Sequence, residues 1–213
     1  MATPATAATT SVPAEAKDPF WAPATVVGLC GFGTTTMIAG LAIATNGINW
    51  GVDNGAVFPM ALAFGGSAQF VAGVIMLRRG EIFPGSAFCG YGAFWWAFTL
   101  FLSGLTGDSA FGPGSAGVYD ICWFMIVWLL FTLTFAINSH YHGIGIAFVF
   151  WTLVLAFLLL AIDFAIVGSG HSPANGLWEA TGIDTFICGF AAWYVATAFI
   201  TMNHHGGKKV LPF

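Results

Sequence analysis

Charged side chains are scarce in this sequence. Of its 213 residues, 5 are Lys or Arg and 9 are Asp or Glu, and charged residues amount to 7% of the chain, against roughly a quarter in an average soluble domain. The chain also has no stripe of basic residues interleaved with aromatic residues, the pattern typical of nucleic-acid-binding proteins. These absences exclude an ordinary soluble domain and a nucleic-acid partner.

Catalytic and metal-binding motifs are missing as well. The sequence contains no HExxH, no GxSxG, no phosphate-binding loop and no pair of carboxylates at helical spacing inside an apolar run. Its cysteines, Cys30, Cys89, Cys122 and Cys188, lie within apolar runs and never at CxxC spacing, which predicts free buried thiols. Closely spaced histidines near the predicted helix ends could chelate a metal, but we interpret them as solvated residues. We therefore predict no enzyme, no cofactor and no metal site.

Long apolar runs are what the sequence does contain. Hydrophobic residues make up 58% of the chain, and the mean hydropathy is +0.85. A bilayer core of about 30 Å needs about 20 apolar residues per helix, and six runs of that length occur: 24–45, 56–77, 86–106, 118–138, 144–168 and 183–203. Because the runs are continuous rather than alternating, they predict an all-α polytopic membrane protein, a six-transmembrane-helix bundle, and not a barrel.

The flanking residues predict the domain organisation and the orientation. Residues 1–20 are expected to form a disordered cytoplasmic tail, because the start of the chain is rich in Ala, Thr and Pro and lacks the features of a secretory signal. Residues 21–213 form the transmembrane domain. If the helices alternate in direction, every Lys and Arg falls on one side, and the opposite loops carry only acidic charges. The positive-inside rule makes the basic side cytoplasmic and predicts that both termini are inside.

The stretch FGGSAQFVAG, residues 64–73, places a glutamine inside an apolar run. A side-chain amide away from water costs roughly a few kcal/mol unless it finds hydrogen-bond partners. Helical spacing puts Gln69 on the same side as Gly65, Ala72 and Gly73, where another backbone or a solute can approach closely. The amide either bonds a neighbouring helix or lines a pore, and we favour the pore.

Hydroxyl groups occur in the first span, in GLCGFGTTTM, residues 28–37. Helical spacing places Phe32 and Thr35 on a face that is otherwise built of small residues, with the hydroxyl of Thr36 next to it. Threonines in membrane helices often bond only their own main chain. Taken alone, these residues are therefore weak indicators of a pathway.

The third span carries aromatic residues in CGYGAFWWAF, residues 89–98. Tyr91 stands between two glycines, so it could either face a pathway or pack as a ring between small residues. Trp95 and Trp96 lie deep in the span, and we interpret such tryptophans mostly as lipid-facing or packing residues.

Asp163, in LLLAIDFAIVG, is a carboxylate well inside a predicted span. An intramembrane acid must be protonated, paired or wet, so it is either a proton-responsive group or an interfacial residue. Five residues separate it from the polar segment that begins at Ser169, which is about 7 to 8 Å along a helix. We favour the interfacial position, in the headgroup water.

Four stretches together carry a family resemblance. GLCGFGTTT is similar to a GLMGFGxTT pattern, FGGSAQFVAG to YGGxAQxxAG, GYGAFW to SYGxFW, and KKVLP to a chain ending in VLP. Their order and spacing agree from about residue 23 to the end of the sequence. On these motifs the chain is identified as a member of the acetate uptake transporter family, which includes bacterial succinate-acetate permeases and the fungal Ato proteins.

This resemblance implies a site. Family members form hexamers of six-helix protomers, each protomer with its own pore and a hydrophobic constriction, which falls here on Phe32, Tyr91 and Leu153. The glutamine that contacts acetate falls on Gln69, where a neutral amide supplies donors without a fixed charge that would trap the ion. The predicted substrate-binding residues are Gln69, Thr35, Thr36 and Tyr91.

The chain departs from the family pattern at its start and in two spans. PATVVGL, residues 23–29, replaces an Asn-Pro-Ala-Pro-Leu-Gly-Leu motif that shapes the pore mouth. Met76 stands where an acidic residue is usual, and Asp163 stands where relatives commonly carry no charge. Proton coupling could consequently use different groups, and Asp163 is the candidate proton-responsive residue.

The function expected from this resemblance is transport across the plasma membrane. The substrates are acetate and related small monocarboxylates, with succinate as a further candidate, and movement is either coupled to protons or passive. The alternative is a channel for small neutral solutes such as urea, because hexameric urea channels share the architecture. A third class is a non-transporting assembly protein.

Overall fold

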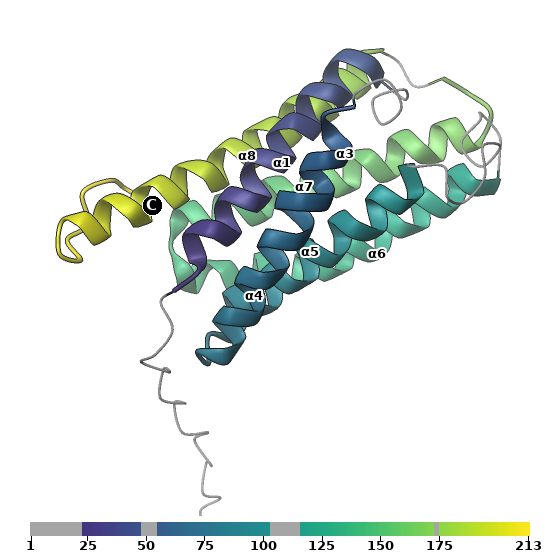
Figure 1. Ribbon diagram of the computed structural model, residues 1–213. Coiled ribbons are helices and arrows are strands. Elements are labelled where there is room, and N and C mark those ends of the chain that lie inside the picture. Colours follow the sequence, from purple (N-terminus) through teal and green to yellow (C-terminus); the bar gives the residue numbers. More distant parts are fainter. Residues whose placement is uncertain (1–22, 48–54, 103–115, 173–174) are drawn as a thin grey trace, which may run out of the picture.

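The structure is a computed structural model that describes residues 23–47, 55–102, 116–172 and 175–213 (Figure 1). The predicted tail at 1–20 lies outside the described residues. The elements in chain order are α1 Thr25–Asn46, α3 Val57–Met60, the π-helix η2 Ala61–Ala68, α4 Gln69–Arg78, α5 Ile82–Leu102, α6 Ala116–Ser139, the 3₁₀ turn η3 His140–His142, α7 Ile144–Gly168 and α8 Asn175–His204. No strand occurs in the described part of the chain, which confirms the all-α prediction.

Five helical segments are long and apolar enough to cross a membrane: Thr25–Thr45, Val57–Arg78, Gly117–His142, Ile144–Gly168 and Gly176–His204. α5 has 21 residues, but its glycines, tryptophans, tyrosine and proline lower its hydropathy, so composition alone does not mark it as a span. The count of six spans therefore stays a prediction.

α1 and α8 lie side by side along most of their length (Figure 1). Glycines face each other at two levels of this contact. A Cβ atom at Gly33 would lie 2.7 Å from the carbonyl oxygen of Gly189, and one at Gly40 would lie 2.7 Å from that of Gly182. Small residues allow two membrane helices to pack backbone against backbone. This contact fixes the position of α1, which lines the site described below.

The second predicted span is one continuous helix of three parts, α3, η2 and α4. The middle part is wound as a π-helix, a form that is rare and often found at functional sites. Gly65, inside η2, packs against Thr35 of α1, because a Cβ atom there would lie 2.7 Å from the Thr35 hydroxyl. The π-helical segment ends at Ala68, and α4 begins at the next residue, the buried Gln69.

The described basic residues lie at one end of the bundle. Arg78 and Arg79 close the second helix, and Lys208 and Lys209 follow α8, at the end where α1 begins (Figure 1). This placement agrees with the charge segregation seen in the sequence. The side of the membrane on which this end lies stays a prediction.

Candidate functional site

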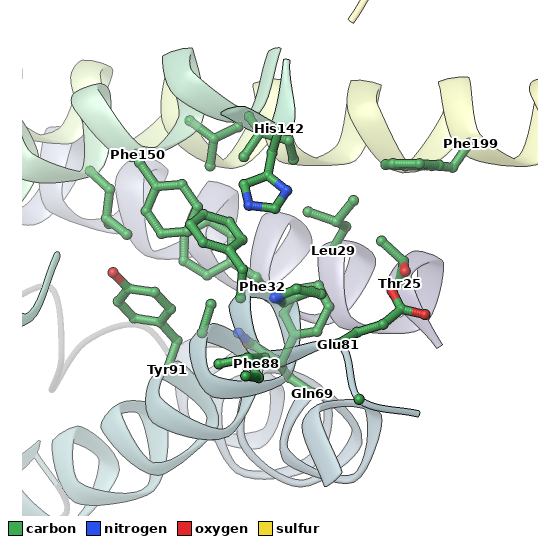
Figure 2. Close-up of a pocket in the computed structure, with 18 residues that line it drawn as sticks. Thr25, Leu29, Phe32, Gln69, Glu81, Phe88, Tyr91, His142, Phe150 and Phe199 are labelled. Atoms are coloured by element: carbon green, nitrogen blue, oxygen red, sulfur yellow. The ribbon is translucent and has the colours of Figure 1, made fainter. Parts of the chain in front are cut away.

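The larger of two described cavities opens toward this basic end and has a volume of about 460 Å³. Figure 2 shows Thr25, Glu81 and Phe199 toward one end of its lining, and Tyr91 and Phe150 toward the other. Its walls are mostly apolar and aromatic, and polar side chains such as Gln69 and His142 are few. A concave, mostly apolar pocket with a few polar groups is typical of sites for small molecules.

A smaller cavity of about 30 Å³ lies further along the same helices. Its lining includes Thr36, Trp95 and Thr185, and the other walls are apolar or aromatic. A cavity must offer about 10–15 Å³ to hold one water molecule, so this space admits a very small solute.

Three helices supply one stripe each to both cavities. The stripes follow the spacing of one helix face, and they comprise Thr25, Leu29, Phe32, Thr36, Ala39 and Ile43 on α1; Pro84, Ala87, Phe88, Tyr91, Phe94, Trp95 and Phe98 on α5; and Ile146, Val149, Phe150, Leu153, Ala156, Phe157 and Leu160 on α7. α1, α5 and α7 are the first, third and fifth predicted spans. Together the stripes connect the larger cavity to the smaller one along these three helices.

Phe32, Tyr91 and Leu153 are the residues that line both cavities. All three are buried, and the rings of Phe32 and Tyr91 have centroids 5.7 Å apart. The structure therefore brings together, at the junction of the two cavities, the three residues predicted for the constriction. The Tyr91 hydroxyl donates to Thr132 Oγ1 on α6 at 2.9 Å.

Gln69 lines the larger cavity and is fully buried. Neither Nε2 nor Oε1 of its amide has a hydrogen-bond partner among the described residues. The close approach of α1 holds it in place, since a Cβ atom at Gly31 would lie 3.3 Å from the Gln69 Cβ. The amide is thus positioned by backbone packing beside the cavity, and its hydrogen-bonding groups are not used by the described residues.

The two threonines predicted as substrate contacts occupy different places. Thr36 lines the smaller cavity, and its hydroxyl donates to the carbonyl oxygen of Phe32 at 2.7 Å. Thr35 lines neither described cavity. It is buried against η2, where its hydroxyl donates to the Met60 carbonyl oxygen at 3.4 Å.

Asp163 is fully buried, so the expected position in headgroup water is wrong. One carboxyl oxygen, Oδ2, accepts a hydrogen bond from the Thr181 hydroxyl at 2.6 Å. The estimate from distance along α7 failed because α8 begins at Asn175 rather than at residue 183, and its extra turns cover Asp163. Trp178 of the same turns packs edge to face on Phe164. Asp163 lines neither described cavity.

Sequence reasoning missed several residues of the site. His142 lines the larger cavity and stacks on Phe83, with ring centroids 3.9 Å apart. Trp95, interpreted as a lipid-facing or packing residue, lines the smaller cavity, whereas its neighbour Trp96 points in another direction and donates to Ser67 Oγ at 3.3 Å. The spacing of Trp95 from Tyr91, four residues along the helix, was the signal that could have placed it on the same face.

The model of the GPR1/FUN34/yaaH family matches residues 7–207. The chain belongs to this family. The match covers every described helix, including the three that line the cavities.

Relatives in the GPR1/FUN34/yaaH family are similar over most of the chain. The succinate-acetate/proton symporter SatP of Escherichia coli K12 is 31% identical over 191 residues, which are 87% of this chain and 92% of that protein. Acetate permease A of Emericella nidulans is 29% identical over 82% of this chain and 60% of its own length. A solved structure of the bacterial acetate channel SatP matches with a TM-score of 0.76 and 27% identity, over 90% of this chain and 98% of that one.

These similarities agree with the architecture. The chain is an all-helical, multi-pass membrane protein whose family includes named transporters and channels. The resemblance inferred from the motifs is confirmed.

Proposed function

We propose that the protein moves acetate and related small monocarboxylates across the plasma membrane, with the termini in the cytoplasm and no catalytic activity. The observation that carries this proposal is the path lined by α1, α5 and α7, with Phe32, Tyr91 and Leu153 at the junction of its two cavities. The relatives named for acetate transport support the choice of substrate. Succinate is a further candidate on the same grounds.

The residues divide into two roles under this proposal. Gln69 donates to the carboxylate in the larger cavity, because its amide is a buried polar group of the lining that has no partner among the described residues. Phe32, Tyr91 and Leu153 form a hydrophobic constriction that limits leakage of water and ions. The large apolar surfaces that α6 and α8 expose, such as those of Trp123 and Phe190, suit contact with lipid or with other protomers of a homohexamer.

Proton coupling is a separate question, since one relative is named a proton symporter and the similar structure is named a channel. The proposed movement of acetate is the same whether the protein is a proton symporter or a channel. The alternative, a channel for neutral solutes such as urea, is tested alongside.

The experiment is uptake of labelled acetate into proteoliposomes, compared with protein-free vesicles. Gln69→Leu removes the amide at similar volume, and we expect at least a threefold loss of acetate uptake, the value of roughly one hydrogen bond. Ser67→Ala is the matched control, because Ser67 lies two residues away, bonds the Leu62 carbonyl oxygen and lines neither cavity. Uptake of urea without uptake of acetate would replace this proposal by its alternative.

A further inference from the structure

The larger cavity has one basic side chain among its described lining residues. Its ionisable lining groups are Glu81, Tyr91 and His142. Glu81 is acidic and forms an ion pair with Arg79 at 3.1 Å. The Tyr91 hydroxyl donates to Thr132. His142 is therefore the lining residue that can present a positive charge to a carboxylate.

The ring of His142 is held on the cavity wall by aromatic packing. It lies face to face with the ring of Phe83, with centroids 3.9 Å apart and an angle of 22° between the two planes. Phe83 is in turn packed edge to face by Phe135 and Phe150, with centroids at 5.4 and 5.5 Å. These contacts position the His142 ring through its face.

The stack leaves the hydrogen-bonding edge of the His142 ring unused. Neither ring nitrogen forms a hydrogen bond with another residue in the described part of the chain. An imidazole ring has at least one N–H donor in either protonation state, and it is positively charged when both nitrogens carry a proton. A carboxylate in the cavity can therefore accept a hydrogen bond from His142 while the ring stays stacked on Phe83.

His142 and Gln69 lie toward opposite sides of the cavity lining (Figure 2). They come from different elements, the turn η3 and the helix α4. The His142 side chain is exposed, whereas Gln69 is fully buried. A solute can thus reach the histidine from the water at the open end, and the amide lies further inside.

The neighbouring histidine does not share this position. His140 lies two residues earlier in the same 3₁₀ turn and lines neither described cavity. Its Nε2 accepts a hydrogen bond from Trp151 Nε1–H at 3.0 Å. The turn therefore carries two residues of the same chemistry in different surroundings, and His140 is a matched control for His142.

We propose that His142 is a specificity-determining residue that selects carboxylates at the entrance of the larger cavity. Its N–H donates to a carboxylate oxygen, and its positive form attracts the anion, before the anion reaches Gln69. This inference rests on the proposed function and adds a residue to it. Because the contact precedes the constriction, it sets the acetate concentration at which transport is half-maximal. The maximal rate depends on Phe32, Tyr91 and Leu153.

The first test is exchange of labelled acetate in proteoliposomes at about pH 7, where carboxylic acids are almost fully ionised. Total acetate is equal on both sides, so both orientations of the protein give the same saturation curve. His142→Phe keeps a ring on Phe83 and removes the donor. We expect the half-maximal concentration to rise roughly three- to tenfold, the loss of about one hydrogen bond, with the maximal rate unchanged within about twofold.

Two further variants separate this role from a structural one. His142→Arg keeps a planar donor group that can stack on Phe83 and is always charged. The half-maximal concentration should stay at or below the value of the unaltered protein. His140→Phe makes the same change outside the cavity lining, and both the half-maximal concentration and the maximal rate should stay within about twofold.

The second test changes the charge at position 142 after the protein has folded. His142→Cys, in a variant without the native cysteines, is modified in detergent with a methanethiosulfonate that adds either an ammonium or a sulfonate group, and is then reconstituted. We expect the half-maximal acetate concentration to be roughly fivefold lower with the ammonium group, because one charge attracts the anion and the other repels it. At His140→Cys the two reagents should give equal values.

Three results would overturn the inference while acetate transport itself persists. The first is an equal half-maximal concentration for His142→Phe and His140→Phe. The second is a lower maximal rate in His142→Phe without a change in the half-maximal concentration, which would assign the ring a structural role. The third is an equal effect of the two reagents at position 142. Absence of any acetate exchange by the unaltered protein would instead refute the proposed function.

Discussion

At the scale of single residues, Gln69 and Asp163 are both buried polar side chains, but their surroundings differ. Gln69 lines a cavity with both amide atoms unpartnered in the described part of the chain, whereas Asp163 lines no described cavity, and its Oδ2 accepts the Thr181 hydroxyl while Oδ1 has no partner there. An unsatisfied buried polar group costs about 1–3 kcal/mol. A solute that hydrogen-bonds the Gln69 amide would offset this free-energy cost. The hydrogen bond between Thr181 and Asp163 instead indicates that Asp163 helps to hold α7 against α8.

Asp163→Asn should preserve this contact, because the amide oxygen of asparagine also accepts from Thr181. We expect acetate uptake and its pH profile to stay unchanged within about twofold. Asp163→Leu removes the acceptor, and we expect a loss of stability of about 1–3 kcal/mol, measured as a lower thermal midpoint in detergent. A lost or displaced pH profile in the Asn variant would instead assign Asp163 a proton-responsive role.

The sequence predicted which residues form the constriction better than it predicted which way each neighbouring side chain points. The motifs placed Phe32, Tyr91 and Leu153 on the helices where they meet. They did not separate Thr35 from Thr36 or Trp95 from Trp96, which are neighbours with the same chemistry. Adjacent positions on a helix point about 100° apart, so a small error in helix phase exchanges a cavity residue for a packing residue.

At the scale of helices, the contact between α1 and α8 depends on glycines that leave no room for a side chain. A Cβ atom at Gly182 would lie 2.3 Å from the main-chain nitrogen of Ala44. The clash is with backbone, which cannot move away as a flexible side chain can. The two helices must separate if Gly182 gains a methyl group, and α1 carries one wall of both cavities.

Gly182→Ala should therefore destabilise the protein. Overpacking costs about 1–3 kcal/mol, which corresponds to roughly 3 to 10 °C in the thermal midpoint of a chain of this length. Gly176→Ala, in the first turn of the same helix, is the control, because nothing lies within 4 Å of a Cβ atom there. Equal midpoints for the two variants, measured by circular dichroism in detergent, would show that the glycine contact is not needed.

Hydropathy predicted that these helices exist better than it predicted the residues at which they begin and end, or whether their turns are α-helical or π-helical. Apolar runs reveal where a chain can lie in lipid, and a helix occupies each of the six predicted runs. The start of α8 was missed because NGLWEATGID is polar by composition, yet Thr181 and Trp178 are buried against α7. The π-helical turns of η2, where Gly65 packs against Thr35, were also missed.

At the scale of the whole molecule, the two ends of the path differ. The larger cavity opens at the end where the described Lys and Arg residues gather, and its rim includes Glu81, which forms an ion pair with Arg79 at 3.1 Å. This pairing offsets a negative charge that would otherwise repel an incoming carboxylate. Which end faces the cytoplasm then decides whether the wide cavity collects substrate from the cell or from outside.

Single cysteines placed in a variant without the four native ones will test the orientation and the number of spans together. Three exposed positions serve: Tyr141 between α6 and α7, His171 between α7 and α8, and Lys208 after α8. With six spans and cytoplasmic termini, a membrane-impermeant maleimide labels His171→Cys in intact cells. It labels Tyr141→Cys and Lys208→Cys only after the membrane is opened, because basic segments stay in the cytoplasm. A fourth exposed position, Arg78 at the end of α4, tests α5. If α5 and α6 both cross, Arg78→Cys and Tyr141→Cys are labelled on the same side, and labelling on opposite sides would show that α5 does not span the membrane. If labelling is reversed at all three positions, the wide cavity faces outward, and acetate would enter the path from outside through it.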